Sequence, residues 1–600
     1  MPAIYWAIIS TLAGVAIAQG NSSTLFSASK LFSGGPSPIV SLSYAQYRGV
    51  QDDKTDTSNY LGIPYAKAPR FDHSQIFNQN LGGVQDASDY GPACPQHNIV
   101  SAFAPSDLGL GLVGGFIESL PFFQKILKQD EDCLYINVQR PQNESLEGLP
   151  VLAWIHGGGF ELGSSSAVGL ETTPVTGIFY QGANIVKRSI DMGQPVVFAS
   201  FNYRLAHFGF TASREFDEAG LLNLGFEDQR NALRWIQKHI ASFGGDPNKV
   251  TIMGESAGSW SVSGHLVANN GDNEGLFRAA MGLSGGPLKV DGPERQQGMF
   301  DDMVRFVGCD SAADKINCLR KAPYEKIYQH MQTITRKDSL IGFRSLASAW
   351  TLRPDGKFFP QSPDKLAAAG RIANVPVLYG DMRDEGTLFS LINQLNLTTT
   401  RDVKEYFKTY WWPAATEQQL NRLMELYPQD PTKGSPYGTG LLYAIPPQYK
   451  RLSSLIGDYS FEAQRRALLQ KVAAPKWNYL IETSIPLRGA ENTILRPLIG
   501  AGDIPILGSF HGADVALYWF NTLPDTISLN SHHLLGVLVS FVNHLDPNMH
   551  KMDGLPNWPQ WDGQNKKTMR FRERGPDIMA DDYREMGINY INEIGDSLRI

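Results

Sequence analysis

Short apolar runs alternate with longer segments of helical spacing along most of the chain. Residues 149–155 and 195–201 are apolar on both faces of a strand, whereas residues 226–243 show helical spacing that stops at Gly244-Gly245. Further short apolar runs follow after other helical segments, at residues 250–253, 279–283 and 375–379. Strands that are buried on both faces and separated by helices predict a mostly parallel sheet covered by helices on both sides. In such a fold we expect the chemistry at the carboxyl ends of the strands.

Composition limits the classes of function. The 600 residues are 42% hydrophobic and 19% charged, which is enough apolar material for a large core. Because α/β folds often grow large as one unit, we expect a single domain over residues 19–600. Lys and Arg (53) against Asp and Glu (60) give a net charge of −7 without a basic run. This balance excludes the electrostatic footprint of a nucleic-acid-binding protein.

The first eighteen residues have the pattern of a secretory signal peptide. Residues 1–18 are uncharged and end in Ala16-Ile17-Ala18, and a polar run follows. The usual basic residue of the n-region is missing, and the alternative is a membrane anchor, for which the segment is barely long enough. No later stretch approaches the length of a membrane span. We therefore predict a secreted, extracellular protein without a transmembrane segment.

Cysteines and glycosylation sequons are consistent with secretion. Four cysteines allow three pairings, and the pairing that is local in sequence joins Cys94 to Cys133 and Cys309 to Cys318. The alternative, free buried thiols, is unusual in a secreted chain. Three sequons are possible glycan sites: Asn21, Asn143 and Asn396.

Two Gly-x-Ser-x-Gly segments compete for the nucleophile, at residues 254–258 and 282–286. A nucleophile elbow needs a strand before the serine, a helix after it and small residues two positions away on either side. Ser256 meets these conditions, because strand 250–253 precedes it and a helical segment, 257–267, follows. Ser284 is followed by a loop. We therefore predict Ser256 as the nucleophile and Ser284 as a structural or neighbouring residue.

Backbone donors for an oxyanion are predicted from His156-Gly157-Gly158-Gly159, which directly follows a strand. The candidate donors are the N–H groups of Gly158, Gly159 and Ala257, the last being the residue after the nucleophile. The alternative for the glycine triplet is a flexible turn.

The general base and the acid are expected after the serine, in the order Ser, acid, His. His511 lies in a glycine-flanked loop before a helix, where an imidazole at a strand end belongs, and it is the candidate base. His265 lies in the helix after the nucleophile, and His532, His533 and His544 lie in or near another helix. Spacing alone leaves the acid open among the three carboxylates that follow strand 375–379, Asp381, Asp384 and Glu385.

Several segments together resemble the type-B carboxylesterase/lipase family of α/β-hydrolases. They are Glu131–Val138, Trp154–Phe160, Phe243–Pro247 and Gly254–Gly258. Within that family the chain is most similar to fungal secreted lipases and sterol esterases, which is supported by Arg353–Gly356, Asp384–Thr387 and Trp558–Trp561. The resemblance runs from about Ser41 to the C-terminus.

The resemblance implies an α/β-hydrolase fold with a mostly parallel central sheet and Glu385 as the acid, which makes Asp381 and Asp384 solvated loop charges. It also implies that Arg204 pairs with Glu131 or Asp132. The disulfide loop 94–133 is then a lid, because it is crowded with apolar residues, although an ordinary packed helix is the alternative.

The function that follows is hydrolysis of apolar carboxylic esters by a Ser–His–Glu triad through an acyl-enzyme, without metal or organic cofactor. The substrate is a hydrophobic ester, for example one at a lipid interface. Two alternatives remain at this point: a non-catalytic cholinesterase-like adhesion module, and acyl transfer to an alcohol by the same residues.

Overall fold

The computed structural model describes nine ranges of the chain, which are residues 32–97, 128–165, 182–334, 342–347, 350–391, 396–483, 507–515, 525–550 and 552–600. The predicted signal peptide, Asn21 and most of the predicted lid loop lie outside the described residues.

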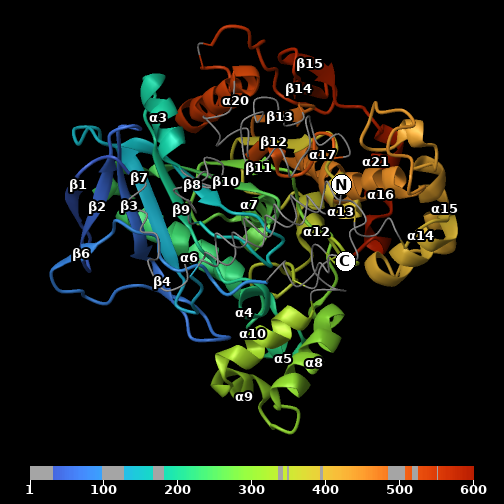
Figure 1. Cartoon of the computed structure of the whole chain (residues 1–600), viewed down its shortest axis with the longest axis horizontal. Coiled ribbons are helices and arrows are strands. Elements are labelled where there is room, and N and C mark those ends of the chain that lie inside the picture. The colour runs from blue at the N-terminus through green and yellow to red at the C-terminus, as the bar shows by residue number, and fades with distance from the viewer. Residues whose placement is uncertain are drawn as a thin grey trace, which may run out of the picture.

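One large sheet organises the described part of the chain (Figure 1). Its strands follow the order β1-β2-β3-β7-β9-β8-β10-β11-β12-β13-β14-β15, and β6 pairs with β2. The central pairs from β9–β8 to β13–β14 are parallel, whereas the outer pairs are antiparallel except for β2–β6, which is parallel. The strand bounds are β1 Pro36–Ser41, β2 Gln46–Asp52, β3 Thr57–Pro64, β6 Val84–Asp86, β7 Tyr135–Pro141, β8 Leu149–Ile155, β9 Val197–Phe201, β10 Gly245–Glu255, β11 Ala279–Leu283, β12 Val377–Met382, β13 Lys476–Ile481, β14 Lys567–Phe571 and β15 Asp577–Ala580. A separate pair is formed by β4 Ala66–Lys67 and β5 Gln75–Ile76.

Alternate residues of the central strands enter two different hydrophobic cores. In β8, Val151 and Ala153 join one core, whereas Leu152 and Trp154 join the other. Helices α6 and α7 contribute to the first core, and α3 and α20 contribute to the second. Figure 1 shows these two helix pairs on opposite sides of the central strands. The predicted sheet with helices on both faces is confirmed.

Helices fill most of the connections between strands. Their bounds are α3 Ala183–Asp191, α4 Ala206–Phe210, α5 Arg214–Glu218, α6 Leu224–His239, α7 Ala257–Val267, α8 Gln297–Val307, α9 Lys315–Lys321, α10 Tyr324–Thr333, α12 Pro363–Ala368, α13 Thr387–Ser390, α14 Thr400–Tyr406, α15 Glu417–Leu426, α16 Tyr449–Gly457, α17 Ala463–Lys471, α20 Asp525–His544 and α21 Glu585–Glu593. After α6 a short 3-10 turn, Ile240–Phe243, ends at Gly244, whose φ of 77° suits a residue without Cβ. Among the described helices, none combines the length and the apolar character needed to cross a bilayer.

Both predicted disulfides are present. Cys94 pairs with Cys133 and Cys309 pairs with Cys318. The first bond closes the loop that contains the undescribed residues 98–127, so the predicted role of that loop as a lid lies outside the described residues. Asn143 and Asn396 are exposed, as a glycan site must be.

Candidate active site

Ser256 lies on a sharp turn between β10 and α7. Its backbone has φ 56° and ψ −121°, a conformation that residues other than glycine rarely adopt. Small neighbours are required here: a Cβ on Gly254 would lie 2.5 Å from the Gly258 backbone, and one on Gly258 would lie 2.1 Å from the Ile155 carbonyl. The strand, strained turn and helix expected for a nucleophile elbow are therefore all present around Ser256.

His511 and Glu385 meet although 126 positions separate them in the sequence. The distance from His511 Nδ1 to Glu385 Oε2 is 2.6 Å, and Glu385 Oε1 accepts a hydrogen bond from the Met382 N–H at 2.7 Å. The imidazole is buried and packs against the rings of Phe389 and Phe461, at centroid distances of 4.9 and 4.6 Å. These contacts hold the ring in one orientation.

Burial opposes charge on both partners. Burial raises the pKa of Glu385 well above its usual range, and the Ser284 hydroxyl and the Met382 N–H act in the opposite direction. Burial lowers the pKa of His511, so the imidazole is neutral at pH 7. A neutral imidazole that donates from Nδ1 keeps Nε2 available to accept a proton.

The glycine loop after β8 lies directly against the serine. A Cβ on Gly157 would be 2.6 Å from the Glu255 carbonyl oxygen and 3.0 Å from Ser256 Cβ. Gly158 and Gly159 have φ values of 102° and 63°, so the turn requires residues that tolerate positive φ. Within the described structure, the backbone N–H groups of Gly158, Gly159 and Ala257 donate to no protein acceptor. The loop that carries the first two N–H groups therefore packs against Ser256 at Gly157, and the third N–H belongs to the residue after Ser256.

Two further carboxyl groups interact with His511, and neither is among the residues predicted from the sequence. Glu255 Oε1 lies 3.3 Å from His511 Nε2, and burial raises the pKa of Glu255 to about 8. Burial also raises the pKa of Asp514 to about 6. Their positions give a sequence signal, because Glu255 directly precedes the candidate nucleophile and Asp514 follows the candidate base by three residues.

In this structure His511 Nε2 faces Glu255 rather than the serine. Among the described contacts, no hydrogen bond joins His511 to Ser256 Oγ. Catalytic hydrogen bonds are often long in the absence of substrate and tighten when it binds. Glu255 and Ser256 are adjacent in the chain, so the group that Nε2 faces in this structure is the immediate neighbour of the candidate nucleophile.

The expectation that Asp381 and Asp384 are solvated loop charges is wrong. Asp381 is completely buried and accepts a hydrogen bond from Arg465 Nε at 2.6 Å. Asp384 is buried and accepts hydrogen bonds from Ser435 Oγ at 2.7 Å and from two backbone N–H groups, those of Tyr437 and Ser509. Asp381 thus ties β12 to α17, and Asp384 holds together the loops that contain Ser435, Tyr437 and Ser509.

The expected partner of Arg204 is also wrong. Arg204 forms a bidentate ion pair with Asp228, at 2.7 and 2.8 Å, and both side chains are buried. Glu131 instead binds Arg70, and Asp132 lies 3.6 Å from Lys67. Asp228 lies on α6, which brings its carboxylate to both the guanidinium and the backbone N–H of Arg204.

Of the other residues considered from the sequence, one lies beside the site and two lie elsewhere. Ser284 directly follows β11 and lies beside Glu385. His265 points away from the serine, stacking on Phe226 and meeting Gln229 at 3.1 Å. His532 contacts Arg188 on α3.

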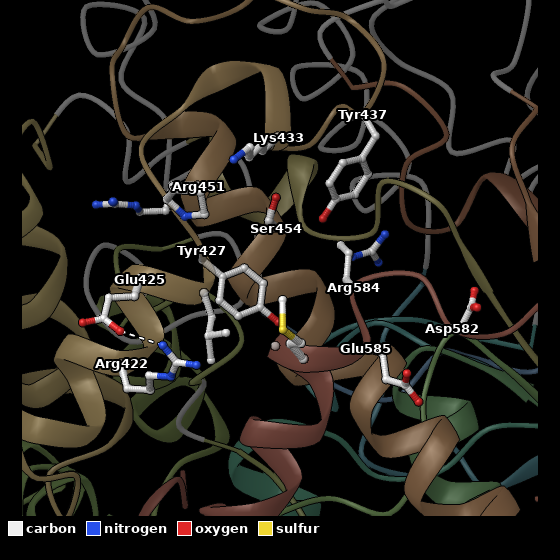
Figure 2. A pocket seen from close by; sticks show the side chains of 15 residues that line it. Arg422, Glu425, Tyr427, Lys433, Tyr437, Arg451, Ser454, Asp582, Arg584 and Glu585 are labelled. Carbon is white, nitrogen blue, oxygen red and sulfur yellow. Dashed lines mark hydrogen bonds and ion pairs between the residues drawn. The ribbon is translucent and has the colours of Figure 1, made fainter.

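A cleft of about 590 Å³ lies apart from these residues, between α15, α16 and α21 (Figure 2). Its lining contains none of the predicted site residues. Its cations already have partners, since Arg422 pairs with Glu425 and Arg584 pairs with the buried Asp458.

Comparison with known proteins identifies the family. The sequence matches the carboxylesterase family over residues 36–591, almost the whole chain. The chain belongs to the carboxylesterase family. Relatives of this carboxylesterase include a secreted triacylglycerol lipase of Gibberella zeae, 36% identical over 90% of this chain and 88% of the relative. Lipase 2 of Geotrichum candidum is 36% identical (90% and 92%), and lipase 2 of Diutina rugosa is 38% identical (84% and 86%).

Solved structures agree with this assignment. The crystal structure of Aspergillus niger EstA aligns with a TM-score of 0.74 at 26% identity, covering 94% of this chain and 99% of that one. A thermophilic PNB esterase, 24% identical, shares the fold with a TM-score of 0.69. The carboxylesterase therefore has the α/β-hydrolase fold and is a carboxylic ester hydrolase, as the sequence predicted, and the non-catalytic alternative is set aside.

Proposed function

We propose that this carboxylesterase is a secreted, lipase-like enzyme that hydrolyses esters of apolar acyl chains with Ser256, His511 and Glu385. The observation that carries the proposal is the 2.6 Å contact between His511 Nδ1 and Glu385. The same imidazole lies 3.3 Å from Glu255, the residue before the strained Ser256 turn. The lipases among its relatives support the proposal that the substrates are apolar. The N-terminal sequence and two relatives named as secreted support the proposal that the protein is exported.

In the first half-reaction, Ser256 Oγ forms a bond to the ester carbonyl carbon while its proton passes to His511 Nε2. The negative charge on the carbonyl oxygen is met by the N–H groups of Gly158, Gly159 and Ala257. Collapse of the tetrahedral intermediate breaks the bond to the alcohol, which takes the proton from Nε2. The product of this step is an acyl group on Ser256.

In the second half-reaction a water molecule replaces the alcohol. His511 takes one proton of the water, the oxygen bonds to the acyl carbon, and the carboxylic acid leaves as Ser256 recovers its proton. Glu385 remains hydrogen-bonded to Nδ1 throughout, which fixes the tautomer and offsets the charge of the imidazolium. An alcohol in place of water gives acyl transfer by the same steps.

The test is active-site labelling together with substitution of the two candidate serines. A fluorophosphonate should label Ser256, and Ser256→Ala should lower turnover of p-nitrophenyl butyrate about a thousandfold or more. Ser284→Ala is the matched control and should retain most activity. Labelling of Ser284, or full activity in Ser256→Ala, would refute the proposed nucleophile.

The lid role of residues 94–133 remains part of the proposal. It is tested by titrating an ester through its solubility limit, with Phe122 and Phe123 changed to serine in parallel. A hyperbolic curve that is unchanged in the double variant would remove the lid.

A further inference from the structure

Three large apolar side chains are exposed within five residues, between η7 (Pro431–Lys433) and α16. Leu441 is 73% exposed, Leu442 is 64% exposed and Ile445 is 88% exposed. The other large apolar side chains that are exposed among the described residues lie apart in the sequence, at Ile39, Val84, Phe306, Met549 and Met586. An exposed apolar patch of this kind marks an interaction site.

The segment around these side chains carries no charge. From Pro436 to Tyr449 there is no Asp, Glu, Lys, Arg or His. Tyr443, in the middle of the segment, is partly buried and packs against the core that α20 covers, so the three exposed side chains project from an anchored turn. Residues 437–446 are called the docking loop below.

Part of the docking-loop backbone is hydrogen-bonded within the protein. The N–H of Leu442 donates to the Thr439 carbonyl at 3.0 Å, and the N–H of Ala444 donates to the Leu441 carbonyl at 3.3 Å. The buried ammonium of Lys450 donates to Thr439 Oγ1 and to the carbonyl oxygens of Gly440 and Leu442, at 2.7, 3.0 and 3.4 Å. These bonds lower the cost of moving that part of the backbone out of water.

The base of the docking loop is tied to the candidate active site. Asp384, next to the triad acid, accepts hydrogen bonds from Ser435 Oγ, the Tyr437 N–H and the Ser509 N–H. Ser509 is two residues before His511. Figure 2 shows Tyr437, the first residue of the loop, at the edge of the cleft beside α16. The loop therefore extends from the edge of the sheet at which Glu385 and His511 meet.

We propose that the docking loop inserts Leu441, Leu442 and Ile445 into the surface of an aggregated lipid ester and holds the enzyme there during hydrolysis. This inference rests on the proposed lipase-like function. A lipid phase fits better than a protein partner, because protein interfaces form about one hydrogen bond per 100–200 Å². The docking loop offers three hydrocarbon side chains and no charged group, which suits a surface that is mostly hydrocarbon.

The experiment measures adsorption separately from catalysis. The full-length protein carrying Leu441→Ser, Leu442→Ser and Ile445→Ser is compared with the wild-type protein for binding to emulsified triolein droplets. Binding is measured in a Ser256→Ala background so that the droplets stay intact. The matched control changes three exposed apolar residues elsewhere, Ile39, Val84 and Met549, to serine.

The triple variant should bind droplets about tenfold more weakly or worse, because most of the apolar area offered to the lipid is lost. With Ser256 intact, it should hydrolyse dissolved p-nitrophenyl acetate within twofold of the wild-type rate, and the control should change neither quantity. Ile445→Ser alone, the mildest change, should weaken binding in the same direction, which guards against a folding defect in the triple variant.

Equal droplet binding by the triple variant and the wild-type protein would overturn the inference. So would conversion of a dimer to a monomer in sedimentation equilibrium without loss of droplet binding, since the patch would then be an interface between two copies. Failure of the proposed function gives a different result: the wild-type protein would not hydrolyse p-nitrophenyl acetate. Droplet binding would still be measurable, because it does not depend on catalysis.

Discussion

Replacing Glu255 by glutamine removes one titratable proton from the candidate site while the size of the side chain is kept. Glu255 Oε1 lies 3.3 Å from His511 Nε2, and the pKa of Glu255 is raised to about 8 by burial. Two groups this close titrate as a unit, so below pH 8 a proton is held between them. Because burial keeps the His511 imidazole neutral, that proton sits on Glu255, whose carboxyl O–H then faces the Nε2 lone pair that must accept the proton of Ser256.

The magnitude follows from this pKa. With a value of about 8, roughly one tenth of the molecules have lost the shared proton at pH 7 and nine tenths at pH 9. The kcat/KM of the wild-type enzyme should therefore rise about tenfold between these pH values. In Glu255→Gln no carboxylate holds the proton, and burial keeps the pKa of His511 below its ordinary value, so the profile should be flat.

The assay is the pH dependence of kcat/KM on a dissolved ester, corrected for spontaneous hydrolysis at each pH. Asp514→Asn is the control, because it removes a charge that raises the pKa of both Glu255 and His511. The rise should persist in this variant and move to lower pH. Parallel profiles for the wild-type enzyme and Glu255→Gln would refute the shared proton.

The two remaining predictions concern the acid and the glycine loop. Glu385→Gln should lower kcat by about a thousandfold or more, because the amide no longer enforces the imidazole tautomer. Asp384→Asn should mainly lower the melting temperature, because Asp384 binds three loop groups. Similar kinetic losses in both variants would point to a different acid. Gly157→Ala should cost about a hundredfold or more in kcat, because its Cβ would lie 3.0 Å from Ser256 Cβ; an active variant with an unchanged melting temperature would show that the loop can shift.

The central elements could be predicted from the sequence because each depends on a local pattern. The strand at residues 149–155 and the helix at 257–267 have the predicted bounds in the structure. Apolar runs between glycines leave few alternatives to a buried strand, and the elbow motif joins strand and helix at a known position. Helix α6 began two residues earlier than predicted, at Leu224, which is within the usual uncertainty of helix ends.

The carboxylates are the part that local pattern could not resolve. Asp381, Asp384 and Glu385 stand within five positions after one strand, and solvation was the expectation for two of them because charged loop residues are mostly exposed. Whether a carboxylate is buried depends on which cation or N–H group the fold brings to it. Arg465 reaches Asp381 from 84 positions away, and the Ser509 N–H reaches Asp384 from 125 positions away. Such partners exist only after the chain has folded, so the role of an acidic residue in this enzyme is decided by tertiary contacts.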